Sequence, residues 1–245
     1  MPYYPRHYLD APPDNAVVWR YMNLEKLLSI LIDRALFFAS ASTLRKDDKY
    51  EGQPTQSEID ALRVDLDTAR ELERTFHVRV ADALFFNCWH MNDDESDAMW
   101  KIYVNGIGGV AIRSTVLRLK KSLDASPHDI SIGRISYNDD VDHFEHPLRR
   151  FMRKKPAFKH EQEVRLVYYD NGLEHIGQSE VLINHERHAG QSGLLIPVNA
   201  DTLIEKIVVS PRAENWFMTI VETIVNRLGY DIEAIPSDGC APLPL

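Results

Sequence analysis

The sequence predicts an α+β protein built on a mixed or antiparallel sheet with flanking helices. Three observations support this fold class. Short runs typical of strands recur along the chain and are more frequent in its second half. These strands do not alternate regularly with helices, as the strands of a doubly wound parallel sheet would. No linker, repeat or low-complexity tract divides the 245 residues, so we expect one domain spanning 1–245.

Composition indicates a soluble, cytoplasmic globular protein. Hydrophobic residues make up 44% of the chain, which is ordinary for such proteins. The formal charge of −9 argues against a general nucleic-acid coat, because neutralising phosphates needs clustered basic residues. No apolar run approaches the roughly 20 residues that span a bilayer, and the N-terminus lacks the apolar core of a signal peptide. Cys88 and Cys240 form no disulfide framework, so reduced thiols are expected.

The first forty residues predict an extended surface arm (1–15) followed by a strand–helix–strand unit. VVWRYM (17–22) has the apolar and aromatic content of a short strand. Asn23 is a favoured N-cap residue, and the leucines of LEKLLSILIDR (24–34) share one helical face. ALFFAS (35–40) is a second strand. We therefore expect one helix to connect two strands here.

Later elements follow from alternation, apolar spacing and capping signals. Up to residue 123 we predict a polar loop (43–56), a long helical side layer (57–80), a strand (81–90), a helix (93–104) opened by an Asn92–Glu95 capping box, a strand (108–114) and a helix (115–123). Beyond it we predict strands at 130–137, 162–169, 180–184, 193–198, 205–211 and 230–235, and helices at 141–155 and 213–229.

Common enzyme signatures are absent, so the candidate sites come from weaker constellations. The sequence has no GxxxxGK[ST] phosphate loop, no GxGxxG, no GxSxG and no HExxH. The first constellation is Arg20 and Tyr21, just before a helix start whose free N–H groups suit an anion. Alternatively, Arg20 pairs with Asp48 or Glu51. These acids, with Asp47, could also hold a divalent cation or simply be solvated, and we predict no metal site.

The second constellation lies on the predicted helix within CWHMNDDESDAMWKIY (88–103). Ser96, Trp100 and Tyr103 stand at i, i+4 and i+7 and therefore share one helical face. Together they could line a pocket for a planar ring. The alternative is that Trp100 and Tyr103 pack in the core. His90, a single histidine after a strand, is interpreted as a structural residue.

The third constellation is the strand KHEQEVRLVYY (159–169). Alternation places Glu161, Glu163 and Arg165 on one face of the strand. Two nearby carboxylates can serve acid–base chemistry, or can accept a ribose hydroxyl and stabilise positive charge at an anomeric carbon. The alternative is a salt-bridged row on a solvated strand face that uses Lys155, Lys159 and Arg165.

These blocks resemble a bacterial family of unknown function. WRYMNLEKLLSIL, LFFAS, DDKYEG, FFNCWHMNDDESDAMWKIY with GGVAI, and K–x–x–F–x–x–E–x–E–V–R–L follow one another as they do in domain-of-unknown-function family twenty-nine seventy-one. The resemblance covers residues 17–210 and implies no activity by itself. Where the family has a block closer to FNDPFE, this chain has RKDDKYEG and keeps Asp48 and Glu51.

More distantly, the chain is similar to the ADP-ribosyltransferase superfamily, which implies a split sheet and NAD as substrate. The resemblance places Arg20 at or near an NAD-contacting position and makes Ser96 and Tyr103 candidates beside the nicotinamide. Glu161–Gln162–Glu163 matches the superfamily's ExE form. It implies that Glu163 binds the nicotinamide ribose and stabilises positive charge as nicotinamide leaves, while Glu161 orients the acceptor.

Three function hypotheses follow. The first is an NAD-dependent ADP-ribosyltransferase or NAD glycohydrolase, of the kind that serves as a toxin or phage-defence effector. Its candidate residues are Glu163 and Glu161 for catalysis, Arg20, Tyr21, Ser96, Trp100, Tyr103 and Arg165 for cofactor binding, and Asp48, Glu51 and Lys155 for substrate binding.

A further hypothesis, the third, is a non-catalytic sensor that binds a nucleotide-like ligand without converting it.

The second hypothesis is a nuclease or glycosylase that acts on nucleic acid, with a carboxylate cluster (Asp48, Glu51, Glu161 and Glu163) that would bind magnesium or act on a glycosidic bond. LRRFMRKKPAFKH (148–160) interleaves basic residues with aromatics, which can hold a phosphate backbone and stack bases. The residues concerned are Arg149, Arg150, Arg153, Lys154, Lys155, Lys159, Phe151 and Phe158. The alternative is a basic helix that balances acidic surroundings.

Overall fold

The computed structural model describes most of the chain. The described residues are 3–54, 60, 65, 67–68, 70–71, 81–104, 106, 108–138, 147–170, 173–176, 180–183, 188 and 190–240. Two predictions lie largely or partly outside them, namely the helical side layer at 57–80 and the first part of the helix at 141–155.

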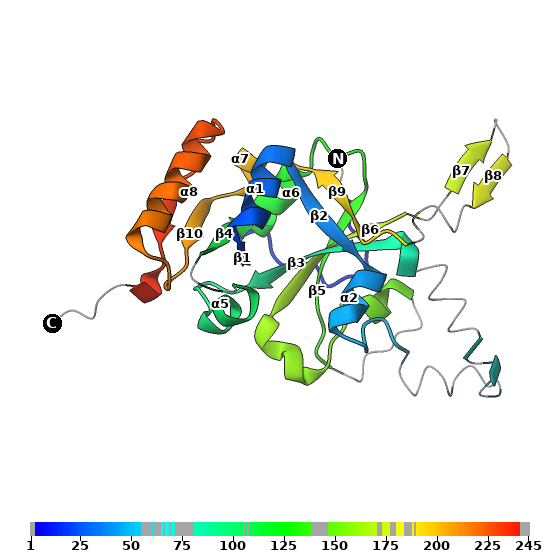
Figure 1. The fold of residues 1–245 in the computed structure, drawn as a ribbon. Coiled ribbons are helices and arrows are strands. Elements are labelled where there is room, and N and C mark those ends of the chain that lie inside the picture. Colours follow the sequence, from blue (N-terminus) through cyan, green and yellow to red (C-terminus); the bar gives the residue numbers. More distant parts are fainter. Residues whose placement is uncertain are drawn as a thin grey trace.

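A nine-stranded sheet forms the centre of the described fold (Figure 1). Its strands are β1 (Val17–Asn23), β2 (Ala35–Ser40), β3 (Leu84–Met91), β4 (Gly109–Thr115), β5 (Ile130–Arg134), β6 (Glu163–Tyr169), β9 (Gly193–Pro197), β10 (Lys206–Val209) and β11 (Ala234–Pro236). The order is β11-β10-β4-β1-β3-β2-β9, and β6 pairs with both β3 and β5. Strands β10 and β11 are parallel, and the other pairs described in this sheet are antiparallel. The predicted α+β class with a mixed sheet is confirmed.

A small two-stranded sheet stands apart from the main one (Figure 1). It pairs β7 (Leu173–Ile176) with β8 (Glu180–Ile183) in antiparallel register. The sequence predicts β8 but not β7.

Six α-helices are described around the sheet. They are α1 (Leu24–Asp33), α2 (Ala41–Asp47), α5 (Asp97–Tyr103), α6 (Val116–Ser122), α7 (Ala200–Leu203) and α8 (Asn215–Arg227). Short 3-10 helices are η1 (Ala81–Ala83), η2 (Pro147–Met152), η3 (Pro156–Glu161) and η4 (Asp238–Cys240). Helices α1, α6 and α8 agree with prediction, whereas α7 and η3 are not foreseen.

The main core lies between the sheet and helices α1, α6 and α8. Each helix contributes fully buried side chains to it, for example Leu27, Leu119 and Val221. These meet residues of β1 and β4 such as Val18 and Ile112, which have no exposed surface. A helical face that buries its apolar stripe in this way is held by packing, because helices this short are marginal alone.

The sheet is split between β1 and β2. Both strands pair antiparallel with β3 along the same edge, but at different ends of it. Strand β1 meets β3 through Trp19 and His90, whereas β2 meets it through Ala39 and Phe86. Between these contacts β1 and β2 diverge, and α1 connects them across the gap (Figure 1). The split sheet that the sequence resemblance implies is therefore present.

The predicted polar loop at 43–56 is wrong in its first part. Residues Ala41–Asp47 form α2, and the side chain of Ser40 caps it by accepting a hydrogen bond from the N–H of Thr43. The polar composition hid this helix, because its sequence ASTLRKD has few apolar residues to mark a buried face. The serine cap at the end of the preceding strand is the signal that could have located it.

The predicted helix at 93–104 begins later than its capping box suggested. Helix α5 begins at Asp97, and Ser96 is the N-cap, with its hydroxyl accepting from the N–H of Met99. Glu95 is engaged elsewhere: its carboxylate accepts from the indole of Trp100 and from Ser237. Those tertiary bonds compete with the cap that the local sequence offered.

Strand β6 begins at Glu163, two residues after the first predicted face residue. Glu161 ends η3, and Gln162 adopts a left-handed conformation with φ of 39°. The predicted helix at 141–155 is, in its described part, the 3-10 helix η2.

The N-terminal arm is hydrogen-bonded to the sheet, because the N–H of Tyr4 donates to the carbonyl of Ile130 at the start of β5.

Candidate functional site

A cavity of about 940 Å³ opens at the split in the sheet. Its described walls come from β1, α1, β2, β3, β6 and β9, from the loop after α2, from α5 and from the 154–161 segment. This volume lies within the range of about 300–1,000 Å³ that is common for ligand pockets. The gap left by the diverging strands is therefore hollowed rather than filled by side chains.

Sheet register aligns three lining residues across neighbouring strands. Trp19 of β1 is the cross-strand partner of His90 of β3, and His90 is the partner of Glu163 of β6. Cross-strand partners project to the same face, about 5 Å apart at each step. Cys88 of β3 and Arg165 of β6 are also cross-strand partners, two residues away along each strand and therefore on the same face.

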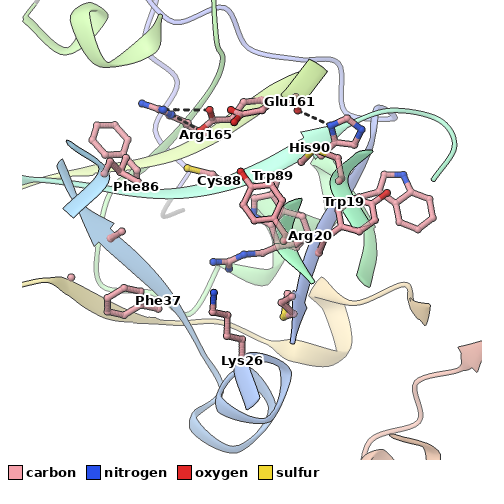
Figure 2. Close-up of a pocket in the computed structure, with 18 of the residues that line it drawn as sticks. Trp19, Arg20, Lys26, Phe37, Phe86, Cys88, Trp89, His90, Glu161 and Arg165 are labelled. Carbon is pink, nitrogen blue, oxygen red and sulfur yellow. Dashed lines mark hydrogen bonds and ion pairs between the residues drawn. The ribbon is translucent and has the colours of Figure 1, made fainter. Parts of the chain in front are cut away.

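One part of the cavity is cationic. Nη1 of Arg20 is buried and has no hydrogen-bond partner among the described residues. Burial lowers the pKa of Arg20 to about 10, which still leaves it charged at neutral pH. Lys26 of α1 extends toward the same space, with the ring of Phe37 beside it (Figure 2). Two positive charges thus face the cavity with no described carboxylate paired to either.

The sequence alternative that pairs Arg20 with Glu51 is wrong. Glu51 binds Arg165 instead, through Oε1 to Nη1 at 2.6 Å and Oε2 to Nη2 at 3.0 Å. The same guanidinium donates from Nε to Oε1 of Glu163 at 2.6 Å and from Nη1 to the carbonyl of Phe151. Arg165 lines the cavity but is only 1% exposed, and all three of its nitrogens are hydrogen-bonded to Glu51, Glu163 and the carbonyl of Phe151.

Lys154 holds the two carboxylates of the ExE motif together. Its ammonium lies 2.5 Å from Oε2 of Glu161 and 2.8 Å from Oε2 of Glu163. Burial alone raises the pKa of Glu163, but Arg165 and Lys154 outweigh it and hold that pKa at about 2. Glu163 is therefore ionised at neutral pH and cannot act as a proton donor there.

This second part of the cavity is net anionic. Glu51, Glu161 and Glu163 carry three negative charges against the two positive charges of Lys154 and Arg165. The cavity is therefore bipolar, with free cations near the split and an excess carboxylate charge at the β6 end. The walls between them are aromatic, and include Trp19, Trp89 and Phe86 (Figure 2).

Two aromatic side chains lie at the mouth of the cavity. Phe37 and Tyr103 are each 42% exposed and both line it. Phe37 is the cross-strand partner of Leu195 and rests over Gly193, where an added Cβ would lie 2.4 Å from its ring. Only glycine fits at that position, because a Cβ would also lie 2.3 Å from the backbone oxygen of Phe38.

Some predicted site residues do not line the cavity. Trp100 is 4% exposed and packs edge-on against Tyr21 at 4.9 Å between ring centroids. Ser96 caps α5, and its N–H donates to the hydroxyl of Tyr21. Tyr103 and Tyr21 do line the cavity, so the predicted helical face is divided between pocket and core.

The predicted substrate-binding residues also separate. Asp48 and Glu51 line the cavity, and a carboxylate oxygen of Asp48 accepts from the N–H of Tyr50. Lys155 does not line it; its ammonium lies 3.0 Å from the centre of the Tyr50 ring. The neighbouring Lys154 occupies the position that the sequence interpretation gave to Lys155.

The basic segment at 148–160 does not form one surface. Phe151 has no exposed surface and stacks on Phe86, so it is core rather than a platform for bases. Arg149 and Arg153 donate to the backbone carbonyls of Tyr8 and Gln53. Phe158 lines the cavity together with Lys154.

Sequence reasoning missed His90, Lys26, Phe37 and Lys154 as pocket residues. Lys26 lies on the helix and Phe37 on the second strand of the strand–helix–strand unit that produces the split, so recognising the split would have indicated them. His90 and Lys154 carry no such local signal, since the place of His90 depends on β3–β6 pairing and that of Lys154 on its contacts with Glu161 and Glu163.

Comparisons with known proteins find distant structural similarity. No protein-family model matches the chain, so membership of family twenty-nine seventy-one has no support there, and no curated protein is significantly similar. Structures of Thermus sp. 2.9 DarT resemble the chain. The complex with carba-NAD⁺ has a TM-score of 0.42 at 11% identity, over 93% of this chain and 98% of that one. The complex with ADP-ribosylated ssDNA has a TM-score of 0.40 at 11% identity, over 94% of this chain and 98% of that one. The complex with NAD⁺ has a TM-score of 0.39 at 13% identity, over 93% of this chain and 97% of that one. Agreement at this level transfers no residue role.

No described helix is long and apolar enough to cross a membrane. Within the described ranges, no group of three or more His, Cys, Asp or Glu side chains is arranged to hold a metal ion.

Proposed function

We propose that the pocket binds NAD and that the protein is an ADP-ribosyltransferase or NAD glycohydrolase. The bipolar charge of the cavity carries this proposal. A buried guanidinium without a protein partner suits a phosphate, since Arg binds phosphate through charge-assisted hydrogen bonds. An ionised carboxylate at the other end suits a ligand that is positively charged there.

NAD has this charge distribution. Its pyrophosphate is anionic, its nicotinamide ring is cationic, and one ribose separates them. Arg20 on β1 and Glu163 on β6 both line the cavity, and β3 lies between their strands. Aromatic side chains that line the same cavity offer faces for stacking the ring.

The proposed reaction breaks the bond between C1′ of the ribose and N1 of nicotinamide. The bonding electron pair leaves with the ring, which becomes neutral, and the positive charge passes to the ribosyl group. Glu163 stabilises that charge, because it is ionised and desolvated. An acceptor O–H or N–H, or water, then bonds to C1′ and releases its proton to solvent. We assign the orientation of that acceptor to Glu161, which shares Lys154 with Glu163.

The decisive experiment is release of nicotinamide from NAD by the purified protein and by a Glu163→Gln variant. We expect the variant to lose about 100-fold or more in kcat/KM, because the stabilising charge is lost while side-chain shape is kept. Glu222→Gln on the exposed face of α8 is the control and should keep full activity. Circular dichroism would show that both variants fold. Unchanged turnover in a folded Glu163→Gln protein contradicts the proposal.

One observation favours a second candidate, a non-catalytic sensor. Both carboxylate oxygens of Glu163 already accept hydrogen bonds, from Arg165 and Lys154, and the residue is only 5% exposed. A carboxylate whose two oxygens are already hydrogen-bonded could help to form a ligand-binding site without taking part in a reaction. Thermal shift with NAD and ADP-ribose separates the two candidates, because stabilisation without nicotinamide release would identify a sensor. A toxin or phage-defence role stays a prediction of the sequence.

A further inference from the structure

His90 is bonded at only one of its two ring nitrogens. The residue lies on β3, lines the cavity and is 3% exposed. Its Nδ1 lies 2.6 Å from the backbone carbonyl oxygen of Glu161 (Figure 2). Its Nε2 is buried and has no hydrogen-bond partner among the residues that the structure describes. Buried polar atoms are normally satisfied, so this nitrogen needs an explanation.

The bond to Glu161 fixes which nitrogen carries the proton. A carbonyl oxygen can only accept, so Nδ1 of His90 must carry a hydrogen and donate it. Burial lowers the pKa of His90, which leaves the ring neutral near pH 7. Nε2 then keeps its lone pair and acts only as an acceptor. The backbone of the ExE turn thereby sets the chemistry that His90 presents to the cavity.

The described neighbours of His90 offer Nε2 no donor bond. Glu163, its cross-strand partner, is ionised and can only accept. The indole N–H of Trp19, its partner on the other side, donates to the carbonyl of Asn92. The ring of Tyr21 stands edge-on with its centroid 6.1 Å away. Among the described residues Nε2 therefore keeps a free acceptor lone pair, on a side chain that lines the cavity.

We propose that Nε2 of His90 accepts a hydrogen bond from a ribose hydroxyl of the ligand. The inference rests on the proposed function, which puts the sugar next to Glu163, the residue paired with His90 across the sheet. Hydroxyls are the donors that such a sugar carries, whereas phosphates at neutral pH are acceptors. His90 is thus a specificity-determining residue that distinguishes ribose from deoxyribose.

The test measures binding of ADP-ribose and of its 2″-deoxy and 3″-deoxy analogues by calorimetry. Binding is preferred to turnover, because removing a hydroxyl also changes the reactivity of the sugar, and ADP-ribose has no nicotinamide to lose. The wild-type protein should bind one of the two analogues about tenfold more weakly than ADP-ribose, the loss expected for one hydrogen bond.

Three variants isolate Nε2. His90→Asn keeps an N–H that can reach the Glu161 carbonyl but is too short to place an acceptor at Nε2, and it should bind all three ligands within about twofold. His90→Gln returns an acceptor near that position and should restore discrimination. His160→Asn is the matched control, since exposed His160 also bonds a backbone carbonyl through Nδ1, and it should discriminate as the wild type does.

Two results overturn the inference in distinguishable ways. If the wild type and His90→Asn discriminate equally, or neither discriminates, His90 does not recognise a sugar hydroxyl although the pocket binds the ligand. If ADP-ribose does not bind the wild-type protein at all, the proposed function fails and the inference fails with it. Should His90→Asn not fold, loss of discrimination in His90→Phe, with discrimination retained in His90→Gln, is the supporting result.

Discussion

At the scale of single residues, two arginines that line the pocket have opposite situations. Arg165 is surrounded by Glu51 and Glu163, and its charge is neutralised inside the protein. Arg20, which is half-buried, has no such carboxylate among the described residues, and its guanidinium carbon lies 5.9 Å from the centre of the Trp89 ring. A buried cation without a counter-ion is costly for the fold. We therefore assign Arg20, and not Arg165, to ligand binding.

Arg20→Met should weaken NAD binding without weakening the fold. Loss of charge-assisted hydrogen bonds to phosphate is worth about 1.5–3 kcal/mol, or about 10- to 100-fold in Kd. The melting temperature should stay the same or rise, because an unpaired buried charge is removed. Calorimetry and thermal unfolding measure the two effects. Arg227→Met, on an exposed position of α8, controls for loss of positive charge. A large fall in stability with unchanged affinity would assign Arg20 to the fold.

His90 should make stability sensitive to mild acid. Its pKa is lowered in the folded protein by burial, so the unfolded chain binds this proton first as the pH falls. The contribution is complete above the unfolded value of about 6.5 and is lost below it, by at most about 1.4 kcal/mol per pH unit. The charged or titratable groups near the ring are Glu161, Glu163, Tyr21 and His160, and the pKa of Glu163 is held at about 2, well below this window.

Urea unfolding at pH 7 and at pH 5 measures this dependence. The wild-type protein should lose more stability between the two pH values than His90→Asn, which has no titrating ring. An equal loss in both proteins would show that other groups control acid sensitivity. Unlike the binding test, this measurement needs no ligand, so it examines the buried neutral ring by itself.

At the scale of elements, α5 shows how a helix start shapes the pocket. The helix has seven residues and depends on its cap and on packing. Its first turn is fixed by Ser96, which caps it and donates its N–H to Tyr21. Its last residue, Tyr103, lines the mouth of the cavity. A start at Asn92 would shift the helical faces and turn other side chains toward the pocket.

The two cap assignments make different predictions for alanine variants. Ser96→Ala should destabilise the protein by about 1 kcal/mol, because an N-cap hydrogen bond is lost. Asn92→Ala should have little effect, since the structure uses the backbone carbonyl of Asn92, which the variant keeps. Thermal or urea unfolding of both variants measures the difference. A reversed order of stability would restore the capping box that the sequence suggested.

At the scale of the whole molecule, one buried ion network joins distant parts of the chain. Glu51 after α2, the carbonyl of Phe151 in η2, and Glu163 on β6 all meet the guanidinium of Arg165. Lys154 extends the network to Glu161. The network fixes both the anionic end of the pocket and the segments that surround it, so the fold and the site depend on the same charges.

Removing Glu51 should be costly. Glu51→Ala leaves Arg165 with one carboxylate in a site that excludes water, and breaking a buried pair from one side typically costs about 3–5 kcal/mol. Urea unfolding measures this loss, and Glu25→Ala on the exposed face of α1 is the control. A loss below about 1 kcal/mol would mean that the pair is solvated in solution and does not organise the pocket.

The sequence by itself determined the strand–helix–strand unit, helix α8, and the alternation that puts Glu163 and Arg165 on one face of β6. These depend on local spacing, which short windows of sequence contain. Arg20 could also be located from the sequence, since it falls between a strand and a helix start. Local capping signals were less reliable, as Asn92 and Ser96 show, because Glu95 takes tertiary partners.

Only the tertiary structure decided which charges are paired and which face the cavity. Glu51 and Arg165 are 114 positions apart, and nothing in the local sequence links them. The choice of Lys154 over Lys155, and the neutral ring of His90, depend on the turn before β6 and on its pairing with β3. Ion pairing and burial are set by contacts between distant segments, so the polarity of the pocket emerges only when the sheet is assembled.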